Sequence, residues 1–191
     1  MSLYSLPNKL TSLRLGLAFV LFFLIDIEYW IFALGVFACA AVTDWLDGYY
    51  ARKRGLTSAL GRVYDPLVDK VQVCGAFVFL LGEQQRSAFS SGAGLNAWMV
   101  TIIIAREFIV TGIRGFLEDK GVSFGADWFG KIKMALQCAA IIAILTTFSA
   151  FERGYATGNL VVIRDILNWV AVGTTFLSGA NYVWKALEHL G

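Results

Sequence analysis

Residues 43–70 read TDWLDGYYARKRGLTSALGRVYDPLVDK, and an apolar segment lies on each side of them. Four aspartates stand near the two ends of this stretch: Asp44, Asp47, Asp65 and Asp69. The first two are three residues apart and the last two are four apart, so each pair lies on one face of a helix. The linker between the pairs contains a glycine and favours a turn between antiparallel helices. The sequence therefore predicts four carboxylates in one small volume.

Four carboxylates beside apolar segments repel one another and lose solvation. Divalent cations would offset this cost, and oxygen ligands in this number suit Mg²⁺ or Mn²⁺, in a pair if both helices contribute. Paired metal ions are suited to phosphoryl chemistry. The alternative is a set of ion pairs at helix ends, in which Arg52, Arg62 and Lys70 offset the charge and the aspartates face water.

The composition of the chain places this stretch in a membrane protein. The 191 residues are 58% hydrophobic and only 16% charged, with a mean hydropathy of +0.65, whereas a soluble domain is about 45–50% apolar and about 25% charged. Two prolines argue against a disordered or collagen-like chain. A net charge of +2 does not indicate nucleic acid, and the three cysteines lie apart in apolar segments without metal-ligand spacing.

Six apolar segments are separated by polar residues. They cover residues 15–25, 29–42, 67–82, 95–116, 134–151 and 160–183. A membrane-spanning helix needs about 20 residues, so we expect an all-α protein with six transmembrane helices in a single domain, residues 1–191. The segment Met1–Arg14 has leucines at helical spacing and is expected to form an amphipathic helix at the membrane surface; a frayed tail is the alternative.

The basic residues indicate the orientation of these spans. With six spans both termini lie on one side, and that side holds 13 of the 16 lysines and arginines. Basic residues are in excess on the cytoplasmic side of membrane proteins. We therefore expect both termini and the aspartates at the cytoplasmic face, of a bacterial inner membrane or a membrane of bacterial descent.

The aspartate stretch resembles the signature of the CDP-alcohol phosphatidyltransferase family, D-x2-D-G-x2-A-R-x8-G-x3-D-x3-D. Every spacing is matched, with Asp44, Asp47, Gly48, Ala51, Arg52, Gly61, Asp65 and Asp69 at the fixed positions. Eight fixed residues over 26 positions make a specific signal.

The resemblance implies a six-helix membrane enzyme whose four aspartates bind two divalent cations, Mg²⁺ or Mn²⁺, which hold the pyrophosphate of a CDP-linked lipid. It implies that Asp69 is the general base that deprotonates the hydroxyl of an alcohol acceptor, which attacks the β-phosphorus and expels CMP. It also implies that Gly48, Ala51, Arg52 and Gly61 line the nucleotide site. Small residues allow a close approach, and an arginine can pair with phosphate.

Three further stretches are similar to bacterial phosphatidylglycerophosphate synthases of that family. They are residues 7–14, PNKLTSLR, residues 105–114, AREFIVTGIR, and residues 130–133, GKIK. Met134 after the last stretch and Tyr64 before Asp65 depart from the pattern of this subgroup. The resemblance implies CDP-diacylglycerol and sn-glycerol 3-phosphate as substrates and phosphatidylglycerophosphate and CMP as products.

Glycerol 3-phosphate is a small dianion and needs a basic pocket beside the metals. Four cations within the similar stretches are candidates for it: Arg106, Arg114, Lys131 and Lys133. The alternative is that these are snorkelling side chains of a positive-inside topology. This alternative is weaker for Arg106, because Arg106 and Glu107 interrupt an apolar segment and charge within a membrane indicates function. We expect Glu107 to pair with a basic neighbour.

Two other functions are possible from the residues. The same family uses other acceptors, as in cardiolipin, phosphatidylinositol-phosphate or phosphatidylserine synthases. A small cation transporter with the aspartates along an ion path is the alternative from another class. Small residues in the last segment, among them Gly173, Ser178, Gly179 and Ala180, indicate close helix packing and a homodimer.

Overall fold

The computed structural model describes residues 6–54, 61–86, 92–120, 128–155 and 158–188, and the side chains of these ranges except 6–10, 44–54, 61–63, 65 and 85–86. The described residues form six helices and no strand. The helices are α1 (Leu6–Asp26), α2 (Trp30–Arg54), α3 (Gly61–Arg86), α4 (Ala97–Asp119), α5 (Trp128–Glu152) and α6 (Gly158–Glu188). The all-α prediction is confirmed for this part of the chain.

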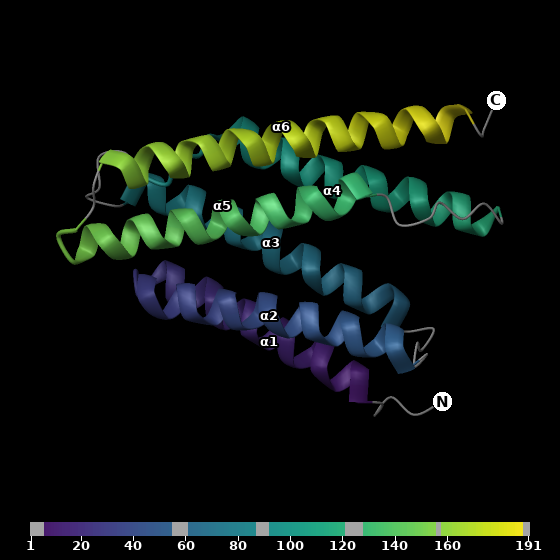
Figure 1. Cartoon of the computed structure of the whole chain (residues 1–191), viewed down its shortest axis with the longest axis horizontal. Helices are drawn as coiled ribbons and strands as arrows, with labels where there is room; N and C mark the ends of the chain where they lie inside the picture. The colour runs from purple at the N-terminus through teal and green to yellow at the C-terminus, as the bar shows by residue number, and fades with distance from the viewer. Residues whose placement is uncertain (1–5, 55–60, 87–91, 121–127, 156–157, 189–191) are drawn as a thin grey trace.

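Successive helices run in opposite directions (Figure 1). The start of α1 and the end of α6 therefore lie at one end of the bundle (Figure 1). We call this the polar end, where α1, α3 and α5 begin and α2, α4 and α6 finish. The antiparallel order brings together, at this end, sequence stretches that are far apart along the chain.

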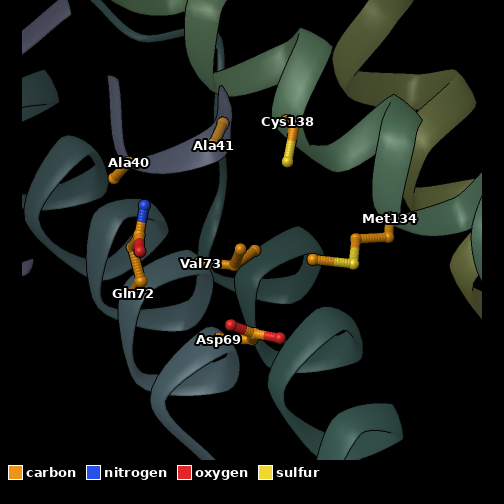
Figure 2. A pocket seen from close by; sticks show the side chains of 7 residues that line it. All are labelled: Ala40, Ala41, Asp69, Gln72, Val73, Met134 and Cys138. Atoms are coloured by element: carbon orange, nitrogen blue, oxygen red, sulfur yellow. The ribbon is translucent and has the colours of Figure 1, made fainter. Parts of the chain in front are cut away.

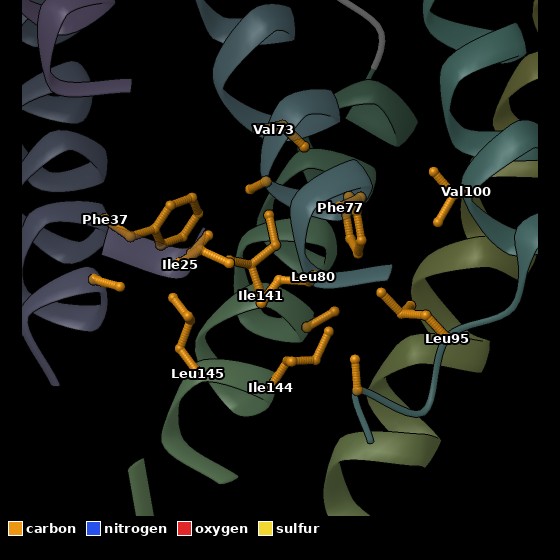
Figure 3. Packing of buried hydrophobic residues seen from close by; sticks show 14 of the residues in the cluster. Ile25, Phe37, Val73, Phe77, Leu80, Leu95, Val100, Ile141, Ile144 and Leu145 are labelled. Atoms are coloured by element: carbon orange, nitrogen blue, oxygen red, sulfur yellow. The ribbon is translucent and has the colours of Figure 1, made fainter. Parts of the chain in front are cut away.

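Helices α3 and α5 lie inside the bundle. Helix α3 packs against α1, α4 and α5, while α5 packs against α2, α3 and α6. Their buried faces meet through Phe77, Leu80, Ile141 and Ile144 (Figure 3). Helices α1 and α3 approach closely at Gly75, where an added Cβ would lie 2.2 Å from the Phe22 ring.

Many large apolar side chains point away from this core. Phe23 and Phe32 are 61% exposed and Leu177 is 66% exposed, although soluble proteins rarely expose wide apolar surfaces. Helices α5 and α6 are long and apolar enough to cross a membrane, and residues 30–43 form a shorter apolar helical stretch. These features are those of a membrane protein.

The N-terminal stretch continues directly into the first apolar segment. An amphipathic helix at the membrane surface was expected over residues 1–14. Residues 6–14 form the first turns of α1 and residues 1–5 lie outside the described part of the chain, so the surface position stays a prediction. Thr11 and Arg14 are buried while Leu13 is 59% exposed. One face of these turns therefore belongs to the bundle.

At the opposite end of the bundle, side chains of α6 bond to the connection between α3 and α4. Arg164 is only 1% exposed and donates from Nη1 to the carbonyl of Gly92, 2.5 Å away. Its Nε and Nη2 donate to the Asp165 carboxylate at 2.9 and 2.7 Å. One turn on, Asn168 Nδ2 donates to the carbonyls of Ala93 and Gly94. The connection between α3 and α4 is thus held against α6 by side-chain donors.

Candidate active site

The eight residues of the aspartate signature lie on two helices at the polar end. Asp44, Asp47, Gly48, Ala51 and Arg52 are on the last turns of α2, and Gly61, Asp65 and Asp69 are on the first turns of α3. Among them only Asp69 has a described side chain. Helices α1 and α5 each pack against both α2 and α3, so the two signature helices border the same interior space.

Asp69 points into that space. Its carboxylate lines a small pocket together with Gln72 from the next turn of α3 (Figure 2). Ala40 and Ala41 of α2 form one wall, and Met134 and Cys138 of α5 form another. The pocket encloses about 20 Å³, which is room for about one water molecule. Asp69 is therefore 28% exposed at a pocket between three helices.

A cation from α1 reaches the same carboxylate. Arg14, whose side chain is 6% exposed, donates from Nη2 to Asp69 Oδ1. Charge-assisted pairs of this kind favour the ionised carboxylate and fix its direction. The sequence offered Arg52, Arg62 and Lys70 as cations that could offset the charge of the aspartates. Arg14 was missed as a partner because it is 55 residues away from Asp69 in the chain. It ends the stretch of residues 7–14, which resembles the bacterial synthases of the family.

A second polar cluster lies among α4, α5 and α6. Glu107 Oε1 accepts from Arg106 Nη1 at 3.3 Å and from Lys133 Nζ. The three side chains are only 7–12% exposed. We call these three residues the Glu107 cluster. The expectation that Glu107 pairs with a basic neighbour is confirmed, and it has two such neighbours.

The cluster carries one net positive charge and an unsatisfied donor. Arg106 Nη2 donates to the Ser178 hydroxyl of α6 at 2.9 Å, but the buried Arg106 Nε has no partner among the described residues. A buried donor without a partner is costly. Such a donor, next to the second cation Lys133, can donate a hydrogen bond to an anionic ligand.

The other two candidate cations are placed differently. Arg114 lies two turns beyond Arg106 on α4, with its Cζ 5.9 Å from the centre of the Tyr182 ring. Lys131 is exposed on α5, and its Nζ is 6.0 Å from the Trp128 ring of the same helix. The structure therefore brings Arg106 and Lys133 together at Glu107, keeps Arg114 on the same helix as Arg106, and leaves Lys131 at the surface.

Lys70 connects the two polar regions. It follows Asp69 on α3 and interacts electrostatically with Asp69 as well as with Arg106, Glu107 and Arg114 of α4. Helix α3 packs against both α4 and α5. The pocket at Asp69 and the Glu107 cluster are thus neighbouring parts of one charged region at the polar end.

The donor types at this end suit a hard divalent cation. The four signature aspartates offer only carboxylate oxygens, which Mg²⁺ and Mn²⁺ prefer. Among the side chains that the structure describes, no three His, Cys, Asp or Glu residues gather closely enough to hold a metal ion. Three of the four aspartates have side chains outside this part, so the predicted metal site stays a prediction.

Comparison with known proteins gives one consistent result. The family model described as CDP-alcohol phosphatidyltransferase matches residues 4–177. A protein of Bacillus subtilis is 35% identical, over 97% of this chain and 98% of its own length. Proteins of Cereibacter sphaeroides and Rickettsia typhi are 32% and 30% identical, over 98% and 93% of this chain and 97% and 94% of their own lengths. Each of the three is named CDP-diacylglycerol–glycerol-3-phosphate 3-phosphatidyltransferase.

Proposed function

Because this chain belongs to the CDP-alcohol phosphatidyltransferase family, we propose that it transfers the phosphatidyl group of CDP-diacylglycerol to sn-glycerol 3-phosphate. The products are phosphatidylglycerophosphate and CMP. The observation that carries this proposal is that relatives from three bacterial genera, similar over more than nine tenths of both chains, bear the name of that activity. The family generally depends on divalent metal ions.

The proposed setting is a bacterial cytoplasmic membrane. We propose that all six helices span it as one catalytic domain, residues 1–191, with both termini on the cytoplasmic side. The antiparallel order of the helices supports this, since it gathers the basic residues at the polar end. The first turns of α1 would lie at the headgroup level, where exposed Leu13 meets lipid.

We propose that Asp44, Asp47, Asp65 and Asp69 hold two divalent ions, Mg²⁺ or Mn²⁺. Their positions on the last turns of α2 and the first turns of α3, both at the polar end, and their all-oxygen donor set support this proposal. When bound, the ions would supply positive charge against the pyrophosphate of the CDP-lipid. Gly48, Ala51, Arg52 and Gly61 are proposed to line the nucleotide site, where Arg52 can donate to phosphate.

In this proposal Asp69 is the general base. Its carboxylate, oriented by Arg14 at the pocket between α2, α3 and α5, accepts the proton of the acceptor hydroxyl. The acceptor oxygen forms a bond to the β-phosphorus, the bond to the CMP oxygen breaks, and CMP leaves. A positioned base of this kind contributes a factor of about 10²–10⁴ to the rate.

The acceptor phosphate is proposed to bind at the cations of α4 and α5. Arg106 and Lys133 take the inner position, and the Arg106 Nε, which has no partner among the described residues, donates to the phosphate. Arg114 adds charge two turns along α4. Lys131, at the surface, attracts the dianion toward the site.

A homodimer is also proposed. The small residue Ala180 is exposed on α6, where it leaves room for a second helix. Cross-linking in native membranes, with Ala180→Ile as the disruptive variant, tests this association.

The transfer is tested with purified protein, CDP-diacylglycerol and Mg²⁺. CMP release should depend on glycerol 3-phosphate, and mass spectrometry should find phosphatidylglycerophosphate. Phosphatidylglycerol, inositol phosphate and serine are offered as competing acceptors. Release with one of these and none with glycerol 3-phosphate would contradict the proposed acceptor, and no release with any would contradict the transfer.

Two changes test the site itself. Asp69→Asn should lower CMP release by about 10²–10⁴-fold, whereas Asp119→Asn, an exposed aspartate at the end of α4, should not. Chelation of divalent ions should abolish release and added Mg²⁺ should restore it. Full activity of Asp69→Asn would refute its role as the base.

A further inference from the structure

One buried face of α6 carries polar and small residues at the polar end. Thr175, Ser178, Gly179 and Tyr182 are three, four and seven residues apart, so they lie on one side of the helix. Each meets a polar side chain of α4 or α5. Thr175 accepts from Gln137 Nε2 at 3.0 Å, and the remaining three contact arginines of α4.

Ser178 fixes one end of the Arg106 guanidinium. Its hydroxyl, in a side chain that is 3% exposed, accepts from Arg106 Nη2. Glu107 holds Nη1. Because the guanidinium is planar and its two terminal nitrogens are both bonded, the direction of the third nitrogen, Nε, is also set. Nε is the one without a partner among the described residues.

Gly179 leaves the space through which the Arg106 side chain passes. An added Cβ there would lie 2.8 Å from Arg106 Cγ, in the middle of the side chain. Real Cβ atoms do not approach so closely, so alanine at this position would force Arg106 into another rotamer. At Gly173 of the same helix, no neighbouring atom of the described residues lies within 4 Å of the corresponding Cβ position.

We propose that Ser178 and Gly179 are positioning residues that aim the Arg106 guanidinium at the acceptor phosphate. This rests on the proposed function, in which Arg106 binds that phosphate. Helix α6 then takes part in acceptor recognition without touching the acceptor. It supplies a hydroxyl that orients the guanidinium and a gap that fixes the path of the side chain.

The two glycines provide a matched test. Gly179→Ala should raise the KM for glycerol 3-phosphate on the order of tenfold, the loss expected when one charge-assisted hydrogen bond is misdirected. The KM for CDP-diacylglycerol should change by less than about twofold, because only the acceptor side is affected. Gly173→Ala should leave both constants unchanged.

The hydroxyl is tested in the same way. Ser178→Ala should raise the KM for glycerol 3-phosphate, and Ser178→Thr should restore it because the hydroxyl returns. Thr174→Val is the control, since the Thr174 hydroxyl donates only to the backbone of its own helix. All variants are compared by thermal unfolding in the same detergent, and equal midpoints separate positioning from folding.

A double-mutant cycle links these residues to Arg106. If Ser178 acts through Arg106, then Ser178→Ala in an Arg106→Met background should cause no further rise in KM. Additive losses would overturn the proposal, as would equal behaviour of Gly179→Ala and Gly173→Ala in an enzyme that uses glycerol 3-phosphate. If the unmodified protein releases no CMP with glycerol 3-phosphate, the proposed function fails instead, and the positioning role fails with it.

Discussion

Arg106 on α4 and Arg164 on α6 are both buried arginines, but their donors are used differently. All three side-chain nitrogens of Arg164 are bonded, to the Gly92 carbonyl and the Asp165 carboxylate. Arg106 bonds through two nitrogens and leaves its buried Nε without a partner among the described residues. A fully bonded arginine holds the structure together, whereas one with a spare donor beside other cations can bind an anion.

The largest expected effect is on stability at the opposite end. Arg164→Met leaves the Gly92 carbonyl without its donor in a buried site and should lower the free energy of unfolding by roughly 3 kcal/mol. The folded fraction should keep its KM for glycerol 3-phosphate. Thermal unfolding measures the loss, and Arg153→Gln, an exposed arginine at the same end, is the control. A lower activity per folded molecule would break the contrast between the two arginines.

Replacing the buried arginine of the polar end, Arg106, by methionine should affect activity and leave folding largely intact. Arg106→Met should raise the KM for glycerol 3-phosphate by roughly 10- to 100-fold, the range for a charge-assisted bond to phosphate. Its unfolding midpoint should stay close to that of the unmodified protein, because Lys133 still neutralises Glu107. If Arg106→Met unfolds as easily as Arg164→Met and its KM is normal, both arginines are structural.

A pair of glycines tests how much the contacts at the opposite end contribute to stability. Gly94 and Gly154 both have positive φ, +66° and +74°, so alanine strains the backbone at either position by about 1–2 kcal/mol. At Gly94 the new Cβ would also lie 2.2 Å from Asp165 Oδ1, whereas at Gly154 it meets no atom of the described residues within 4 Å. Gly94→Ala should therefore unfold more easily, by about 1–2 kcal/mol. Equal midpoints would show that the contact with Asp165 relaxes without cost.

The smallest effect is expected at Lys131, the exposed cation. Lys131→Gln should raise the KM for glycerol 3-phosphate about two- to threefold at low ionic strength, and the difference should vanish at high salt because exposed charges are screened. The buried Arg106 should keep its effect at both salt concentrations. Kinetics at two ionic strengths measure this, and a salt-independent effect of Lys131→Gln would place that residue in direct contact with the acceptor.

The helical architecture could be predicted from the sequence because apolar segments of sufficient length alternate with charged linkers. Each helix coincides with one predicted segment, apart from residue 29 before α2 and residues 95–96 before α4, and α1 and α2 extend well beyond their segments. The observed start of α4 differs from the predicted one because a capping residue sets it. Helix α4 begins after Asn96, whose side chain accepts a hydrogen bond from the Met99 amide at 2.9 Å. Apolar periodicity does not reveal such a cap.

The parts of the candidate site formed by residues close together in the sequence were predictable. The contacts between residues far apart in the sequence were much less so. The spacing of the aspartates and the pairing of Glu107 were accessible because helical periodicity relates neighbours. The Arg14–Asp69 and Arg106–Ser178 contacts join residues 55 and 72 positions apart, and only the packing of the helices shows them. Ser178 and Gly179 were attributed to close helix packing and a dimer. The structure buries both of them against α4 of the same chain, which confirms the helix packing.

Ser178 and Gly179 lie in a helix that is synthesised after α4 and α5. Arg106 and Glu107 are adjacent in α4, so in the proposed six-span topology this helix would carry a neutralising pair when it enters the bilayer, where a lone charge is expensive. Lys133 would join them when α5 follows. The guanidinium would acquire its final direction only after α6 has been inserted. A nascent chain that contains every family-like stretch up to residue 133 would therefore still lack an organised acceptor site.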